Sequence, residues 1–280
     1  MRYRLRRIAR ATYFALYRAG AFRPIRVVHG LSRISRRIHT NQTAPMKTLF
    51  YDRTAYSLSS EPVPNCFLKL DDHFDTLFSD HREFAVNRNV LLAESVCSRM
   101  ADVEMYAFLM EDARKRNSLD RKEDDRAAIL TRSFLIGFLG SCQALLDSCA
   151  STLATLYELP LTPSERTFFN SDFWHQFVLL VPAVHRRYHP LRLFFNEILH
   201  WQRETVYRLP PLVALHSHYG HLPGRDAQLR VVDDSHFELD RLAQEPYAAA
   251  WIDPLELYSR WKPRLLSLCE KICQDIENRS

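Results

Sequence analysis

Two long runs of apolar residues at helical spacing constrain the fold of this 280-residue chain most strongly. In each run the apolar side chains recur at steps of three and four residues, which places them on one face of an α-helix. The sequence therefore predicts two long helices, joined by the charged segment 111–126. Their stripes are Leu92, Val96, Met100, Val103, Ala107 and Met110, then Leu130, Phe134, Phe138, Cys142, Leu145, Cys149, Leu153 and Leu156.

Glycine is scarce, with six residues in the whole chain. Because a β-rich fold needs many tight turns, this scarcity also favours helices. Gly137 and Gly140 lie in the second long helix, where they would permit close approach by a neighbouring helix. No uninterrupted apolar run approaches the roughly 20 residues needed to cross a bilayer, so we expect no membrane partner.

Three further helices are expected from their start and stop signals. Thr162-Pro163-Ser164-Glu165 forms a capping box, which predicts an aromatic-rich helix up to Val181 that is ended by Pro182. Pro190 opens a helix that ends at the double proline Pro210-Pro211. Asp253 caps the last helix, whose expected core stripe is Tyr258, Trp261, Leu265, Leu268, Ile272 and Ile276.

A few short strands complete the prediction. Leu212–Leu215 and Leu229–Val232 are expected as strands, and Phe67–Leu70 as another, followed by a turn or helix cap at Asp71-Asp72-His73. We prefer the turn or cap to a metal site at these three residues. The fold class is therefore mainly all-α, with a small β excursion between the last two helices.

Charge divides the chain near residue 46. Residues 1–45 contain eleven arginines but no lysine and no acidic residue. Residues 46–280 therefore hold 27 of the 38 basic residues and all 33 acidic ones, which gives this part a net charge of −6. This extension could be an organellar transit peptide, a basic arm for RNA or anionic lipid, or upstream sequence before a start at Met46. We favour the last interpretation and expect residues 1–45 to lie outside a single helical domain, 46–280.

The six cysteines are expected to be reduced thiols in a cytoplasmic protein, because nothing resembles a secretory signal. The pairs Cys142/Cys149 and Cys269/Cys273 have helical spacings, which favour small buried hydrophobes over metal ligands. No P-loop, G-x-S-x-G turn or dinucleotide-binding glycine pattern occurs in the sequence. We therefore expect no cofactor.

The stretch W-Q-R-E-T-V-Y-R at 201–208, followed by L-P-P-L-V at 209–213, resembles the last-helix motif of HEPN-like proteins. These are helical bundles of bacterial defence, toxin–antitoxin and RNA-processing systems. The resemblance covers roughly residues 88–278 and implies a HEPN-like bundle, RNA or a protein as partner, and a homodimer. In active members the helix reads W-R-N-x-x-V-H-R, and its arginine and histidine serve RNA cleavage.

This chain departs from the family pattern at both of those positions. Aligned on Trp201, Val206 and Arg208, the family arginine falls on Gln202 and the family histidine on Tyr207. Glutamine supplies no cation to a phosphate, and the tyrosine hydroxyl, with an ordinary pKa near 10, is a poor proton shuttle at neutral pH. The resemblance therefore implies a non-catalytic protein that binds RNA or a protein partner in a defence or stress context.

A polar stripe on the same helix supports an alternative. Asn196, His200, Arg203 and Tyr207 recur at steps of four, three and four, so they share one side of the helix. A divergent, metal-independent ribonuclease would use His200, Arg203 and Tyr207 as catalytic groups. Whether or not the chain cleaves RNA, the expected binding residues are Asn196, Gln202, Glu204 and Arg208. A solvated helix face is the competing interpretation.

A histidine cluster supports a second alternative. His216, His218 and His221 could bind a metal together with Asp226, Asp233 or Asp234, which would make the chain a metal-dependent hydrolase. The spacing matches no standard metallohydrolase motif, so an ordinary polar loop is the simpler interpretation.

Overall fold

The computed structural model of the chain describes residues 62–77, 87–117, 124–203, 213–215, 229–232 and 251–280. All of them belong to one compact unit, Thr48–Ser280. The described residues are mostly helical, which confirms the mainly all-α class. The helices are α4 (Asn65–Leu77), α6 (Arg88–Asn117), α7 (Asp124–Leu156), α8 (Ser171–Leu180), α9 (Pro182–Tyr188), the 3₁₀ helix η2 (His189–Leu191), α10 (Arg192–Gln202) and α12 (Pro254–Glu277).

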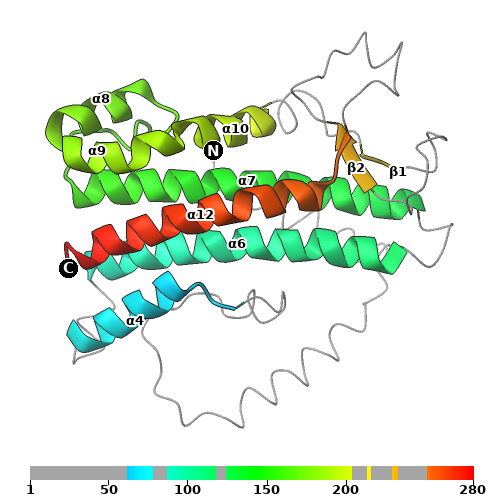
Figure 1. Ribbon diagram of the computed structural model, residues 1–280, viewed down its shortest axis with the longest axis horizontal. Helices are drawn as coiled ribbons and strands as arrows, with labels where there is room; N and C mark the ends of the chain where they lie inside the picture. The colour runs from blue at the N-terminus through cyan, green and yellow to red at the C-terminus, as the bar shows by residue number, and fades with distance from the viewer. Residues whose placement is uncertain (1–61, 78–86, 118–123, 204–212, 216–228, 233–250) are drawn as a thin grey trace. The chain divides into compact units, whose positions relative to one another are not determined.

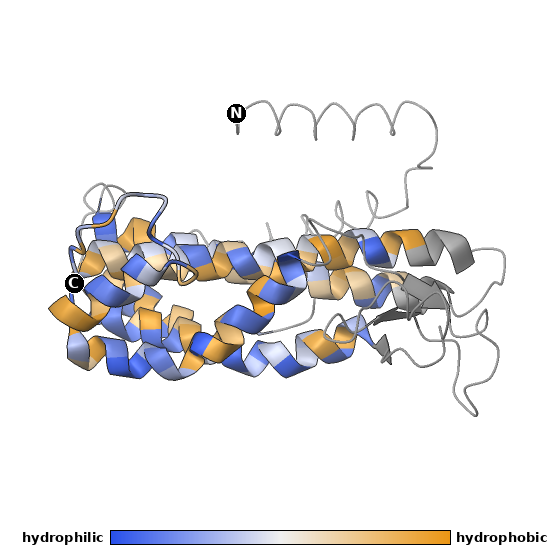
Figure 2. Ribbon diagram, turned by 90° about the horizontal axis from the view of Figure 1, so that it is seen from above, coloured by the Kyte–Doolittle hydropathy of each residue, from blue (hydrophilic) through white to orange (hydrophobic). Residues whose placement is uncertain are grey.

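The two predicted long helices are α6 and α7, and they form the centre of the fold. They pack along each other as an antiparallel pair, with α12 lying alongside both (Figure 1). Both predicted stripes face the core: all of their members are buried except Leu92, Leu130 and Phe134, which are half-buried. Figure 2 shows the resulting alternation of hydrophobic and hydrophilic residues along the helices.

The last helix, α12, begins as its sequence predicts and joins several layers. The Asp253 side chain accepts a hydrogen bond from the Leu255 amide at 2.9 Å, and Pro254 occupies the first helical position. The Trp261 ring stacks on Phe138 of α7 at 5.8 Å and meets Phe194 of α10 edge-on at 6.3 Å. On another side α12 is covered by α4, which also contacts α6.

The predicted strand at Phe67–Leu70 is wrong, because these residues belong to α4. Phe67, Leu70 and Phe74 are all buried, and their spacing of three and four residues is helical. Asp71 lies in the middle of this helix and is buried, so the predicted turn or cap is also wrong. The helical spacing was obscured because two acidic residues follow the first apolar ones.

The start of the aromatic helix is also later than predicted. The Thr162 amide does donate to the Glu165 carboxylate at 2.7 Å, but this contact closes a turn rather than a helix. Helix α8 begins instead at Ser171, where the Asn170 side chain accepts from the Asp172 amide. Pro182 follows the end of α8, and it also starts α9.

Three short strands form a small antiparallel sheet in the order β1-β2-β3. β1 (Val213–Leu215) pairs with β2 (Leu229–Val232), with Val213 opposite Val231. β2 pairs with β3 (Trp251–Ile252), with Val231 opposite Ile252.

One described helix segment, Ile129–Leu156 of α7, is long and apolar enough to cross a membrane by length and composition alone. The core helix of a globular bundle passes the same test. Here α7 packs against α6, α10 and α12, and its predicted stripe is part of the core.

Gly137 and Gly140 provide a matched test of helix packing. A Cβ atom at Gly137 would lie 2.2 Å from the Tyr106 ring of α6, whereas one at Gly140 would meet nothing within 4 Å among the described residues. We expect Gly137→Ala to lower the free energy of unfolding by about 1–3 kcal/mol through overpacking. Gly140→Ala should raise it by about 0.5–1 kcal/mol through helix propensity. Urea denaturation of both variants measures the difference, and equal effects would contradict the α6–α7 contact.

Candidate functional site

A basic surface is formed by α9, η2 and the start of α10, beside α8. Between Phe173 and Asn196 the sequence has no acidic residue, but it has three arginines and three histidines. Arg186, His189 and Arg192 are exposed. Because residues 46–280 carry a net negative charge, this surface differs in sign from the body that holds it.

The centre of this surface is a group that we call the Trp174 cluster: Trp174, His185, His189 and Arg192. The two imidazole rings lie 5.0 Å apart, and they meet the Trp174 ring edge-on at 5.7 and 6.2 Å. The Arg192 guanidinium lies 5.9 Å from the Trp174 ring centroid. Trp174 itself is buried and donates its indole N–H to the Phe168 carbonyl at 2.7 Å, which fixes the ring on which the others lie.

The electrostatics of the cluster favour an anion. Partial burial lowers the pKa of His185, and the neighbouring His189 and Arg192 lower it further. Among the described residues, no carboxylate pairs with Arg186 or Arg192. A bound anion would therefore offset the repulsion among His185, His189 and Arg192, which the described part of the protein leaves uncompensated.

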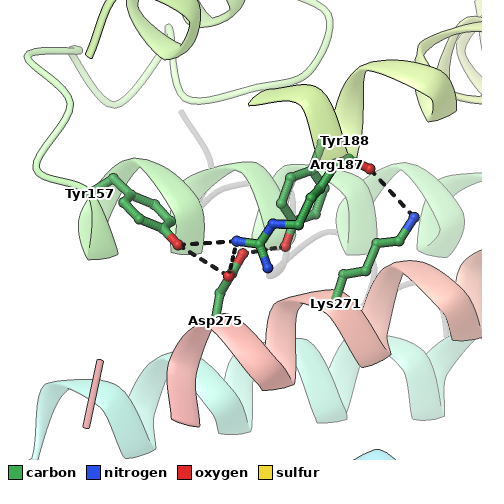
Figure 3. Close-up of polar contacts among 5 residues, drawn as sticks. All are labelled: Tyr157, Arg187, Tyr188, Lys271 and Asp275. Carbon is green, nitrogen blue, oxygen red and sulfur yellow. Dashed lines mark hydrogen bonds and ion pairs between the residues drawn. The ribbon is translucent and has the colours of Figure 1, made fainter. Parts of the chain in front are cut away.

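A buried carboxylate holds α9 in place under this surface (Figure 3). The Asp275 side chain on α12 is 1% exposed and accepts hydrogen bonds from three donors. They are the Tyr157 hydroxyl at 3.1 Å, the Tyr188 hydroxyl at 2.6 Å and the Arg187 guanidinium. We call these four residues the Asp275 network. It joins the segment after α7 to α9 and to α12.

The surroundings of the Asp275 network tighten this attachment. Burial raises the pKa of the Tyr188 hydroxyl far above its ordinary value, and the Asp275 charge and hydrogen bond raise it further, so this hydroxyl remains a donor. Lys271 of α12 also donates to the Arg187 carbonyl at 3.4 Å. The orientation of α9, and with it that of Arg186 and His185, therefore depends on α12.

The described residues include four of the site residues expected from sequence. Asn196, His200 and Arg203 are exposed, and their spacing keeps them on one side of the helix. Gln202 is instead 6% exposed, and its side-chain oxygen has no hydrogen bond among the described residues. The remaining candidates, Glu204, Tyr207, Arg208, His216, His218 and His221, lie outside the described residues.

Sequence reasoning missed both the Trp174 cluster and the Asp275 network. The acid-free run from Phe173 to Asn196 is a signal that could have identified the basic surface. The network has no comparable signal, because Tyr157, Arg187 and Asp275 come from three separate segments. Within the described ranges, no group of three or more histidine, cysteine or acidic side chains could hold a metal ion.

Comparison with protein-family models, with curated proteins and with solved structures gave no match. The HEPN-like resemblance therefore rests on the residues quoted from this chain.

Breaking the Asp275 network should destabilise the fold. In Asp275→Asn the buried side chain loses its charge, and one of its donors loses its acceptor. We expect a loss of about 3 kcal/mol in the free energy of unfolding. The control is Arg99→Ala, which removes the exposed ion pair with Asp102 and should cost less than about 0.5 kcal/mol. Thermal and urea unfolding measure both variants, and a similar small effect for the two would contradict the structural role of Asp275.

Proposed function

We propose that the chain is a HEPN-like helical protein, with a small β excursion, that binds RNA without cleaving it. The observation that carries the proposal is the basic surface of α9, η2 and the start of α10, in a chain whose residues 46–280 carry a net negative charge. RNA phosphates are its ligand, and the Trp174 cluster with Arg186 is the contact region. A protein partner with an acidic surface is the other outcome that the test below can give.

Phosphate binding follows from the chemistry of these side chains. Arg186 and Arg192 are exposed guanidiniums, and none of the described carboxylates occupies either of them. Guanidinium groups match phosphate oxygens in a two-donor geometry, and each phosphate contact gains free energy by releasing counterions. The buried indole beneath Arg192 limits the freedom of its side chain, so less entropy is lost on binding.

Absence of cleavage follows from the two substituted motif positions. Gln202 stands where active relatives have an arginine, and it is buried on the core side of α10. Tyr207 stands where they have the histidine. A general acid or base near neutral pKa and a cation at the reacting phosphate are both needed for metal-independent cleavage, and neither substituted residue supplies one.

Removing charge from the basic surface should weaken RNA binding. In the full chain, we expect Arg186→Ala/Arg192→Ala to bind a labelled single-stranded RNA about tenfold more weakly. The slope of log affinity against log salt should become shallower by about 0.7 for each phosphate that the variant no longer neutralises. Fluorescence anisotropy measures both quantities.

The matched control is Arg99→Ala/Arg132→Ala, which removes the same charge from exposed positions on α6 and α7. Both double variants keep residues 1–45, so any RNA binding by that segment contributes equally to the two measured affinities. An equal weakening in the two double variants would refute the assignment of the surface. Binding should also tighten from about pH 8 to about pH 5.5, because a bound anion favours the protonated form of His185, whose pKa is otherwise held low. His185→Gln/His189→Gln should flatten this dependence.

A divergent ribonuclease is the second candidate, since His200 in the last turn of α10 and Arg203 directly after that helix are both exposed. Incubation of a labelled mixed RNA pool with the full chain separates it from the main proposal. Metal-independent cleavage that is abolished in both His200→Ala and Arg203→Ala would replace binding by catalysis. The metal-hydrolase alternative at His216, His218 and His221 stays a prediction, tested by metal analysis of the purified protein.

The resemblance also carries a proposal for the assembly and its setting. HEPN-like proteins commonly act as dimers, so we propose a cytoplasmic homodimer with a role in defence, toxin–antitoxin or stress systems. One chain has a mass of 32.9 kDa. Light scattering at micromolar concentration should therefore give twice that mass. A monomeric mass would contradict the dimer without affecting the RNA-binding proposal.

A further inference from the structure

Exposed apolar side chains are concentrated around the end of α8. Val178, Leu179 and Leu180 occupy the last turn of α8 and are between 45% and 60% exposed, and Leu193 at the start of α10 is 83% exposed. These four, which we call the apolar corner, are the majority of the seven large apolar side chains that are exposed in the described ranges. A concentration of this kind marks an interaction surface.

The core does not use the apolar corner. Phe173, Trp174 and Phe177 are the residues that α8 buries. The solvent side of an amphipathic helix normally carries polar side chains, but the last turn of α8 carries valine and leucine there. Because exposed apolar area is unfavourable in water, a partner that covers these side chains gains the free energy of removing them from water.

Cations lie directly beside the apolar corner. α9 packs against α8 (Figure 1), and Arg186 in the second turn of α9 comes six residues after the end of α8. Arg192 immediately precedes Leu193. The Arg192 guanidinium also lies 5.9 Å from the ring centroid of Trp174, which is one turn before Val178 on α8. Exposed leucines and exposed arginines therefore belong to one continuous surface.

We propose that the apolar corner and the basic surface together bind the surface of an anionic phospholipid bilayer. The leucines enter the boundary between headgroups and acyl chains, and the guanidinium groups contact lipid phosphates. Stable attachment at a bilayer surface generally requires two signals, such as an apolar insertion and a basic patch, and this surface supplies both. The electrostatic part of the binding is weakened by salt.

Other occupants fit this surface less well. RNA phosphates neutralise the arginines but leave the four apolar side chains in water, so RNA binding does not account for the apolar corner. A two-fold contact with a second copy brings two basic surfaces close together, and like charges repel. A stable protein interface needs roughly 20–30 residues on each side, whereas a bilayer needs only the few side chains that insert.

Binding at the bilayer surface differs from the membrane contact that the sequence made us doubt. No membrane partner was expected because no apolar run is long enough to span a bilayer. Attachment at the surface needs no such run, since only the side chains of one corner enter the headgroup region.

The first test is co-sedimentation of the full chain with vesicles of phosphatidylcholine and phosphatidylserine. We expect binding that falls about tenfold on vesicles of phosphatidylcholine alone. Leu179→Ser/Leu180→Ser should weaken binding to the anionic vesicles about tenfold, because it removes the inserted apolar area. The matched control is Leu77→Ser/Leu91→Ser, which makes the same change at exposed leucines of α4 and α6 and should keep the binding. Circular dichroism confirms that both variants are folded.

A second measurement locates the inserted residue, so that lipid binding by residues 1–45 does not affect the answer. With Leu179→Trp, vesicles that contain brominated lipid should quench the fluorescence of the new indole. With Leu77→Trp, the fluorescence of the new indole should not change. Quenching requires the indole to reach the lipid chains, so it reports insertion of the apolar corner itself.

Several outcomes would overturn the proposal. The unmutated chain could fail to bind anionic vesicles, or the two serine double variants could bind them equally. Loss of RNA affinity in Leu179→Ser/Leu180→Ser would assign the apolar corner to RNA, and a halved mass in light scattering would assign it to a second copy. The RNA-binding proposal is tested separately by Arg186→Ala/Arg192→Ala with labelled RNA, so either proposal can fail without the other.

Discussion

The position of the basic surface depends on one buried carboxylate. Asp275 is 1% exposed, and a charge in that setting is tolerated only when donors surround it. Two tyrosine hydroxyls and one guanidinium do so, and they come from the end of the α7 segment and from α9. Since Arg187 lies between Arg186 and Tyr188, the residue that neutralises the carboxylate also fixes the helix that presents the exposed cations. Asp275 therefore affects both the stability of the fold and the position of the exposed cations on α9.

An aromatic layer makes the same surface stiff. Phe168 stacks on Phe195 at 4.4 Å and on Trp174 at 5.7 Å, and Phe173 meets Phe168 edge-on. These rings have few rotatable bonds and a large buried area. The cations above them therefore project from a rigid platform, whereas arginines on a mobile loop would lose more freedom on binding a phosphate.

The main helices could be predicted because their signal is repeated many times. Each of the long stripes of α6 and α7 has six or more apolar positions, so single polar interruptions do not hide the period.

Short elements gave less information about their secondary structure. Phe67–Leu70 has too few residues to distinguish a strand from a helix, and Thr162–Glu165 forms its capping contact in a turn that does not lead directly into a helix. Asn196, His200 and Arg203 are exposed, and their role in a site stays a prediction, whereas Gln202 was expected at a binding surface and is buried. The Asp275 network could not be derived, because nothing in the sequence relates Tyr157, Arg187 and Asp275 before the fold brings them together.

The contact between α4 and α12 has a consequence for how the chain reaches its fold. Helices α6 and α7 are neighbours in sequence, so their pairing closes a short loop at small entropic cost. The docking of α4 on α12 joins segments at opposite ends of the domain, and the Asn89 side chain likewise bonds to the Arg279 carbonyl, 190 residues away. Such long-range contacts are slow to form, because the entropy of ordering the chain is lost before they contribute any stability. Because α12 covers apolar faces of α6 and α7, any state in which this last helix is undocked would leave those faces open to solvent and expose the chain to aggregation.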